Sequence, residues 1–267
     1  MSISRMRRLT RLFDELGVPQ RGAKLYRKIA AEDSADATTL AALGRLEHDA
    51  GRPDSAVRYL SRALEHDSQP WALWYDYAKA LTDVGRRRAA LGALDSVIER
   101  KPDHVWARRR RAALYADIGR RKEAREEVHR LLRLSEDYSD VMAAASVLLK
   151  TNRYEEALDL YRKAGELRPE ESAPRYFVNL TLTRLGRDNE AVERWTEYSR
   201  EFDTDYRGPY QLGKLAVNRG EWKEAARHLT RALARENYDN AHYYLALAHY
   251  NLKNLDSARV HIASFRK

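Results

Sequence analysis

The chain has 267 residues, 43% of them hydrophobic and 33% charged, a balance that excludes a disordered chain and predicts a folded protein with a well-solvated surface. It has no cysteine, which excludes thiolate catalysis, disulfide bonds and cysteine-based zinc sites. The formal net charge is +9, and residues 86–133 contain 15 Arg and Lys against 7 Asp and Glu, so most of the excess lies in one segment.

The N-terminal segment MSISRMRRLTRLF is basic but lacks the apolar core and the small-residue cleavage site of a secretory signal. No window of the sequence approaches the roughly 20 apolar residues that a membrane-spanning helix needs. These features predict a soluble, cytoplasmic protein.

A turn motif recurs along the whole chain at intervals of 33 or 34 residues. In it, a glycine or a residue in its place is followed five positions later by a small residue, usually alanine. The pairs are Gly17/Gly22, Gly51/Ala56, Gly85/Ala90, Gly119/Ala124, Asn152/Ala157, Gly186/Ala191, Gly220/Ala225 and Lys253/Ala258. Such regular spacing indicates tandem structural repeats.

Each repeat is predicted to form two helices. About 14 residues with helical apolar spacing, such as Trp74, Tyr77 and Leu81, precede the turn, and a second amphipathic run follows it. The turn glycine suits the left-handed conformation that ends a helix. Pro102 and Pro169 fall where second helices are expected to end.

In chain order, we expect a single solenoid of eight units: 3–36, 37–70, 71–104, 105–137, 138–171, 172–205, 206–238 and 239–267. Small residues seven positions before the turn and five after it predict close contact between paired helices. Three units depart from this pattern. The first has Thr10 and Gly22 at its small positions, the sixth has Asn179, and the fourth has Arg108 and Arg111 at packing positions, where we expect them to contact the neighbouring unit through Asp76 or Asp83.

The segments GRLEHDAGRPDSAVRYL, LKTNRYEEALDLYRKA and GKLAVNRGEWKEAARHL show a small residue at position 8 of the repeat, Gly near position 15, Ala at position 20 and an aromatic residue near position 24. In this pattern the chain resembles the tetratricopeptide repeat family over residues 3–267. The resemblance implies an all-α fold, a right-handed α-solenoid superhelix of about eight antiparallel helix pairs, with the first helices lining a concave groove.

In that geometry, positions 5 and 9 of each first helix point into the groove. None of these sixteen positions is acidic, although the chain has 40 Asp and Glu. The N-terminal half is mostly cationic and the C-terminal half is rich in tyrosine, which predicts a groove for an acidic, extended segment of a protein or peptide partner. The predicted groove residues are Arg7, Arg11, Arg45, Tyr75, Lys79, Arg109, Tyr176, Tyr210, Lys214 and Tyr243.

The sequence offers no pattern typical of an enzyme. No His-Glu-x-x-His pair and no phosphate-binding glycine loop is present. His242 and His249 are seven residues apart and share a helix face, but no carboxylate completes a metal site with them. We therefore expect no catalytic residue, no metal and no cofactor.

Two arginine-rich clusters follow turn glycines 34 residues apart, and we expect them to stack along one edge. This basic rim consists of Arg86, Arg87, Arg88, Arg120, Arg121 and Lys122. It suits an anionic partner, but no aromatic residues are interleaved with it, which makes nucleic-acid binding through residues 86–133 the weakest of the functions considered.

The sequence ends with Ser264-Phe265-Arg266-Lys267, inside or just at the end of the eighth second helix. No capping helix follows, so Leu255, Ile262 and Phe265 are expected to leave an apolar terminal face. Such a face predicts self-association, binding of a partner, or a longer chain of which this is the N-terminal part.

The leading hypothesis is a non-catalytic scaffold that binds an acidic or extended partner segment. The alternative is an assembly or oligomerisation module of a bacterial biosynthetic enzyme system, such as envelope-glycan synthesis, a possibility that rests on analogy within the family.

Overall fold

The computed structural model describes residues 1–32 and 36–265, and this part of the chain consists of sixteen α-helices and one short 3-10 helix, with no strand. The helices are α1 (Ile3–Glu15), η1 (Pro19–Gly22), α2 (Ala23–Glu32), α3 (Ala37–Asp49), α4 (Pro53–His66), α5 (Trp71–Asp83), α6 (Arg87–Arg100), α7 (Val105–Asp117), α8 (Arg121–Leu132), α9 (Tyr138–Lys150), α10 (Tyr154–Leu167), α11 (Ser172–Arg184), α12 (Asp188–Glu201), α13 (Arg207–Asn218), α14 (Trp222–Leu233), α15 (Asp239–Asn251) and α16 (Leu255–Phe265).

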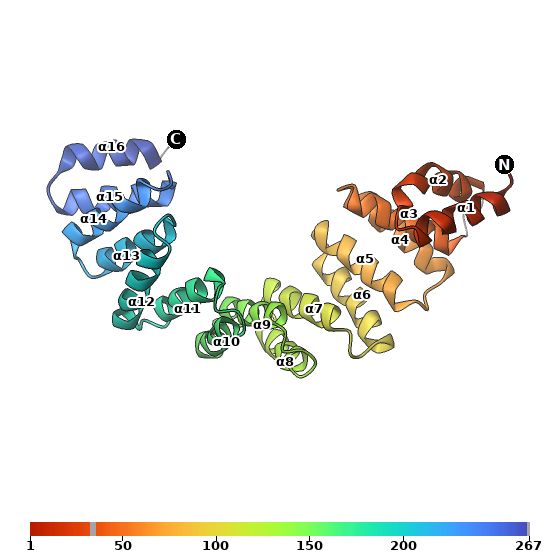
Figure 1. The fold of residues 1–267 in the computed structure, drawn as a ribbon, viewed down its shortest axis with the longest axis horizontal. Coiled ribbons are helices and arrows are strands. Elements are labelled where there is room, and N and C mark those ends of the chain that lie inside the picture. The colour runs from red at the N-terminus through yellow and green to blue at the C-terminus, as the bar shows by residue number, and fades with distance from the viewer. Residues whose placement is uncertain (33–35, 266–267) are drawn as a thin grey trace. The chain divides into compact units, whose positions relative to one another are not determined.

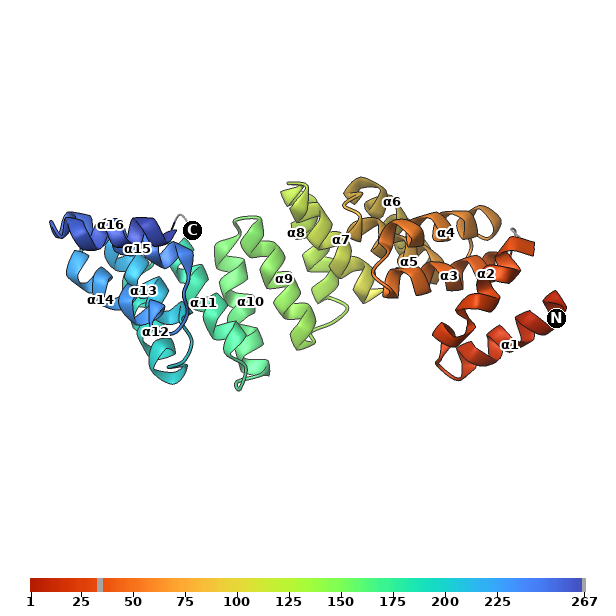
Figure 2. The same ribbon diagram turned by 90° about the horizontal axis from the view of Figure 1, so that it is seen from above.

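The chain forms two compact units, Met1–Thr151 and Asn152–Lys267. Within each unit, successive helices pack side by side as hairpins (Figures 1 and 2). The predicted all-α repeat architecture is confirmed. Residues 33–35 of the first predicted repeat and 266–267 of the eighth lie outside the described residues.

All eight predicted turn positions adopt the left-handed backbone conformation, with φ between 63° and 77°. Six are glycines, and Asn152 and Lys253 take the same conformation. The turn after α5 shows how the helix ends: the N–H of Arg86 donates to the carbonyl of Leu81, and the N–H of Gly85 donates to Thr82. The local sequence therefore sets where each first helix stops.

The small residues bring the two helices of a hairpin into close contact. Ala78 and Ala90, on facing helices of the third repeat, are fully buried. A Cβ built on Gly44 would lie 2.5 Å from Leu60 Cγ, and one on Gly213 would lie 2.5 Å from Leu229 Cγ. At position 24, these two leucines replace the aromatic residue expected there. In these two repeats the Leu side chain lies directly against the backbone of the glycine on the facing helix.

Arg108 and Arg111 pack in a buried ionic network, not against the aspartates that the sequence suggested. The Glu127 side chain is only 1% exposed and accepts hydrogen bonds from Arg108 Nη1 at 2.8 Å and Arg111 Nη2 at 2.5 Å. Arg111 Nη1 also donates to Asp95 at 2.7 Å. The predicted pairing with Asp76 or Asp83 was wrong, because those carboxylates bind Arg45 and His48 of the second repeat.

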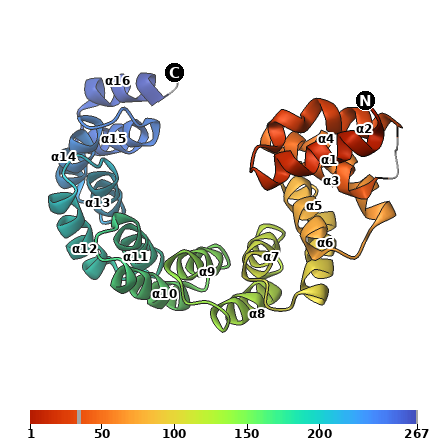
Figure 3. The same cartoon turned by 45° about the vertical axis from the view of Figure 1, so that its right-hand side comes forward.

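In the second unit, α11, α13 and α15 follow one side and α10, α12 and α14 follow the other (Figure 3). The first helices of the repeats thus share a surface, which we call the inner surface of this unit. Side chains one helical turn apart on these helices face the same way.

Candidate partner-binding site

A cavity of about 600 Å³ lies on the inner surface of the second unit. Four of the ten predicted groove residues meet in it: Tyr176 from α11, Tyr210 and Lys214 from α13, and Tyr243 from α15. The other residues that line it are Leu180, Arg184, Gln211, Tyr238, Asn240, Tyr244 and Phe265. No carboxylate is among the eleven lining residues.

Two cations face this cavity. Lys214 Nζ lies 5.5 Å from the ring centres of both Tyr210 and Tyr244, within the range of a cation–π interaction. Burial, and then repulsion from Arg184, lowers the pKa of the Lys214 ammonium. Arg184 is exposed. In the described part of the chain neither cation has an ion-pair partner, so an anionic group entering the cavity would meet two uncompensated positive charges.

The aromatic rings around Lys214 form a connected wall. Tyr210 is 8% exposed and contacts Tyr238 edge-on, with ring centres 5.0 Å apart. Tyr243 lies 5.7 Å from Phe265 and remains 49% exposed. Burial raises the pKa of the Tyr210 hydroxyl, so this group stays a neutral hydrogen-bonding group. The wall therefore offers apolar ring surface with hydroxyl groups beside it.

The cationic residues predicted in the N-terminal half are largely paired within the first unit. Arg7 Nε lies 2.8 Å from Asp36 Oδ2, and Arg45 Nε lies 2.5 Å from Asp76 Oδ2. Arg109 Nε donates to Asp140 Oδ1 at 2.7 Å. None of these aspartates is at position 5 or 9 of a first helix. The absence of acidic residues from those sixteen positions therefore did not reveal that the arginines are paired.

The remaining predicted groove residues of the first unit do not meet in one cavity. Tyr75 and Arg109 line a cavity of about 410 Å³ together with Trp106, whose ring centre lies 4.3 Å below the Arg109 guanidinium. Arg11 lines a separate hollow formed by α1. Lys79 is half-buried on α5.

Arg184 and Tyr244 are the functional candidates that the sequence prediction missed. Arg184 follows Tyr176 and Leu180 at intervals of four residues, so it extends the same face of α11 by one turn. Counting a third position on each first helix would have found it. Tyr244 is adjacent to Tyr243 and reaches the cavity through its contact with Tyr210, with ring centres 6.1 Å apart.

The basic rim lies where α6 and α8 begin. Arg86 and Arg120 are the N-cap residues of these helices and make no side-chain cap hydrogen bond. Arg120 pairs with Glu123, and Arg87 Nε lies 3.9 Å from Asp117. The first turn of α6 has no acidic residue, whereas α4, α10, α12 and α14 each have at least one. Positive charge at a helix N-terminus is unfavourable because it opposes the helix dipole. The stability of α6 therefore does not explain why these arginines are present.

On α16, the predicted terminal apolar face is exposed: Leu255 by 49%, Ile262 by 44% and Phe265 by 41%. Phe265 also lines the inner-surface cavity. Self-association through this face stays a prediction.

Three histidines of α15 and α16 form a cluster, of which the sequence pattern indicated only His242 and His249. His242 Nδ1 lies 2.9 Å from His261 Nδ1, and the ring of His249 stacks on His261 with centres 5.7 Å apart. Among the described residues, no group of three or more His, Cys, Asp or Glu is arranged to hold a metal ion. No helix of the described residues has the length and apolar character needed to cross a bilayer.

Comparison with known proteins places the repeats in a family. Three models described as tetratricopeptide repeat match residues 47–98, 141–173 and 210–263. Among curated proteins, DnaJ homolog subfamily C member 3 of Rattus norvegicus is 29% identical over 126 residues, 46% of this chain and 25% of the relative. A TPR repeat-containing thioredoxin of Arabidopsis thaliana is 36% identical over 93 residues, 35% of this chain and 14% of the relative. The chain thus spans a quarter or less of the length of these relatives.

Solved structures show the same fold over more of the chain. A tetratricopeptide repeat protein of Parabacteroides merdae has a TM-score of 0.64 at 16% identity, covering 92% of this chain and 98% of its own. The C-terminal part of a TPR repeat-containing protein of Cytophaga hutchinsonii has a TM-score of 0.70 at 11% identity, covering 91% and 99%. YrrB, described as a TPR protein with an unusual peptide-binding site, has a TM-score of 0.53 at 20% identity, covering 68% and 95%. These structures share the fold, and the three family models, which together match just over half of the residues, show that the chain belongs to the tetratricopeptide repeat family.

Proposed function

We propose that the protein is a non-catalytic interaction scaffold that binds an acidic, extended partner segment at the inner-surface cavity of residues 152–267. The family relationship supports a protein–protein interaction scaffold in general. The observation that supports this particular site is the pair of cations, Arg184 and Lys214, in a tyrosine-walled cavity without a lining carboxylate.

The chemistry of the cavity selects for a carboxylate beside apolar surface. An acidic side chain would compensate Arg184 and Lys214, and its neighbours in an extended segment would lie on the exposed ring of Tyr243. In the first unit, by contrast, the predicted groove arginines already form ion pairs within the chain: Arg7 with Asp36, Arg45 with Asp76 and Arg109 with Asp140. This difference favours the second unit as the partner site.

The test is a binding titration with a fluorescein-labelled decapeptide of alternating glutamate and alanine. Its matched probe has lysine in place of each glutamate. We expect the acidic peptide to bind and the basic peptide not to bind. Lys214→Met, which keeps the aliphatic stem, combined with Arg184→Glu is expected to weaken binding about tenfold or more, because two charge-assisted contacts are lost.

Arg227→Glu is the control, because Arg227 is exposed on α14, pairs with Glu224 and does not line the cavity. Equal binding of the acidic peptide by the parent chain and the double variant would contradict the proposal. Affinity capture on the parent chain and on the double variant, followed by mass spectrometry, then identifies partners that depend on the site. A cytoplasmic location, and the alternative of an assembly module in a biosynthetic system, stay predictions.

A further inference from the structure

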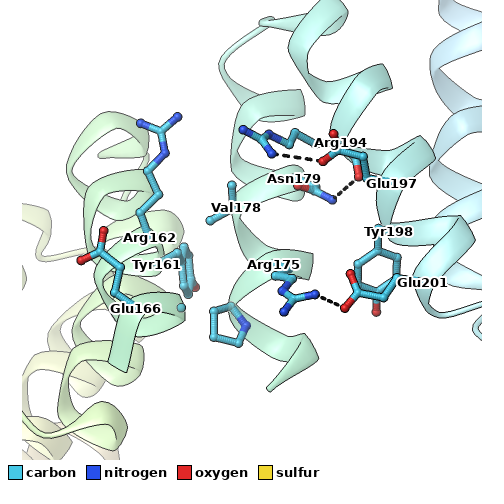
Figure 4. A pocket seen from close by; sticks show the side chains of 12 residues that line it. Tyr161, Arg162, Glu166, Arg175, Val178, Asn179, Arg194, Glu197, Tyr198 and Glu201 are labelled. Atoms are coloured by element: carbon cyan, nitrogen blue, oxygen red, sulfur yellow. Dashed lines mark hydrogen bonds and ion pairs between the residues drawn. The ribbon is translucent and has the colours of Figure 1, made fainter. Parts of the chain in front are cut away.

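A second cavity of the same unit, about 490 Å³ in volume, lies between α10 and α12 and is floored by α11 (Figure 4). Its apolar surface comes from the ring of Tyr161 on α10, Pro174 and Val178 on α11, and the ring of Tyr198 on α12. A volume in this range accommodates more than one side chain of a bound segment.

Beside this cavity, one repeat lacks a side chain that four other repeats supply. Gly165 occupies position 28 of its repeat, where four others have Leu64, Ile98, Leu132 and Leu233. Leu64 is buried in the core of the first unit, and Ile98 and Leu233 are partly buried against their cores. A Cβ on Gly165 would meet only Pro174 Cβ, at 3.6 Å. The glycine therefore leaves open, beside Pro174, space that an aliphatic side chain occupies in the other four repeats.

The neighbouring repeat has a related cavity of about 400 Å³ beside the small residue Ser199, but the helix contact under it is closed. There, Ser199 occupies position 28, and a Cβ on Gly208 opposite it would lie 3.0 Å from Ser199 Cβ. At that contact the backbones of α12 and α13 approach each other closely. The backbones of α10 and α11 do not approach as closely at Gly165 and Pro174, so the space between them remains open to solvent.

This cavity and the inner-surface cavity lie on opposite faces of α11. Tyr176 and Arg184 face the inner-surface cavity, whereas Pro174 and Val178 line the second one. Residues two apart on a helix point about 200° from each other, which separates Tyr176 from Pro174 and from Val178. Two ligands can therefore occupy the two cavities independently.

The charges around the rim are compensated, with one exception. Arg194 Nη1 lies 3.1 Å from Glu197, and Arg175 pairs with Glu201 (Figure 4). Arg162 Nη2 lies 3.3 Å from Glu190, outside the cavity. Within the described part of the chain, Glu166 is the lining charge without an ion pair. It is exposed on α10, next in sequence to Gly165.

We propose that this cavity is a second docking site, which takes a leucine-, isoleucine- or phenylalanine-type side chain of a partner protein segment that also carries a lysine or arginine. The apolar side chain fills the space that Gly165 leaves, and the basic residue pairs with Glu166. The site is distinct in position and in charge preference from the acidic-segment site proposed above.

The experiment is selection of a random dodecapeptide library displayed on phage against the parent chain, followed by affinity measurement of the enriched peptides on variants. Gly165→Leu installs the residue of the other repeats and is expected to bind the enriched peptides about tenfold more weakly or not at all. Its melting temperature should equal or exceed that of the parent chain, because Leu favours a helix more than Gly and fills the space.

Gly92→Leu is the matched control, since Gly92 lies within α6 and nothing lies within 4 Å of a Cβ built there. It should leave binding unchanged. Glu166→Lys, a surface change that does not fill the cavity, should weaken the same peptides. Lys214→Met with Arg184→Glu should not affect them, which separates this site from the inner-surface site.

Enrichment of peptides that combine an apolar side chain with a basic one, and that lose affinity for Gly165→Leu, supports the proposal. The proposal is overturned if no peptide that combines an apolar and a basic side chain is enriched, or if such peptides bind the parent chain and Gly165→Leu equally well.

Discussion

Arg109 of α7 donates hydrogen bonds from Nε and Nη2 to Oδ1 of Asp140, at the beginning of the next first helix, α9. Asp140 is 3% exposed and also accepts a hydrogen bond from Ser135 Oγ at 2.6 Å. The pair joins two successive repeats of the first unit. An arginine expected to bind a partner is therefore already bound to its own chain.

Replacing Asp140 by Asn should destabilise the first unit by about 1–3 kcal/mol, because Arg109 keeps its burial but loses its counter-charge. Chemical denaturation measures the change. Asp137→Asn, one turn earlier and exposed, should change the free energy of unfolding by less than about 0.5 kcal/mol. Equal effects of the two changes would mean that the pair contributes nothing.

The network around Glu127 should be more sensitive. Glu127→Gln removes the one negative charge that Arg108 and Arg111 share in the core, and Arg130 lies 3.4 Å from the same carboxylate. We expect a loss of about 3–5 kcal/mol, typical when one member of a buried ionic network is removed. Glu126→Gln, at the exposed adjacent position, is the control in the same denaturation experiment.

The turns and the close helix contacts could be predicted because their causes are local. A single helix pair needs a left-handed residue at position 15 and a small residue at position 8. The roles of Gly85 and Ala78 can therefore be inferred from the sequence of their own repeat. The Arg109–Asp140 and Arg45–Asp76 pairs each span 31 residues and depend on how one repeat lies on the next. No spacing rule within a repeat contains that information.

The sites were predictable to different degrees for the same reason. Tyr176, Tyr210, Lys214 and Tyr243 were found because equivalent positions of successive first helices share a surface. The cavity beside Gly165 depends on an absent side chain and on backbones that do not close over it. The sequence shows the glycine, but only the structure shows that nothing fills the space.

Gly44→Ala tests one of the two closest helix contacts. The new Cβ would lie 2.5 Å from Leu60 Cγ, so Leu60 or the backbone of α4 must move. We expect a net loss of about 1–3 kcal/mol even though Ala favours a helix more than Gly. Gly92→Ala, in open space, should instead stabilise the chain by about 0.5–1 kcal/mol, and a stabilised Gly44→Ala would refute the tight contact.

The histidine cluster predicts a pH dependence of stability. Burial, and then repulsion from His242 and His249, lowers the pKa of His261 below its usual value of 6.5. The unfolded chain therefore binds more protons than the folded chain just below pH 6.5. The free energy of unfolding contributed by this group is complete above that pH and is lost as the pH falls towards the lower folded pKa.

Denaturation of the parent chain between pH 7.5 and 5 should show this loss, with contributions of the same sign from His104 and His228, whose pKa values burial also lowers. His261→Gln should make the dependence shallower. His66→Gln, an exposed change outside the cluster, should leave it as in the parent chain. An unchanged slope in His261→Gln would show that the cluster does not couple protonation to folding.

The basic rim gives the final prediction. Arg86, Arg88, Arg121 and Lys122 lie at helix N-termini, with no ion pair to another described residue, so they add cationic side chains to helix ends that already favour anions. If the rim binds nucleic acid, a 30-nucleotide single strand should be retarded in a gel at low salt. Without interleaved aromatic residues, binding should be independent of nucleotide sequence. The logarithm of the binding constant should fall with the logarithm of the salt concentration, with a slope of roughly 0.7 per phosphate contact.

Changing all four of these rim residues to Ala should abolish the retardation, whereas Arg227→Glu should not. Failure of the parent chain to retard either DNA or RNA would leave acidic protein surfaces as the partners that the rim fits.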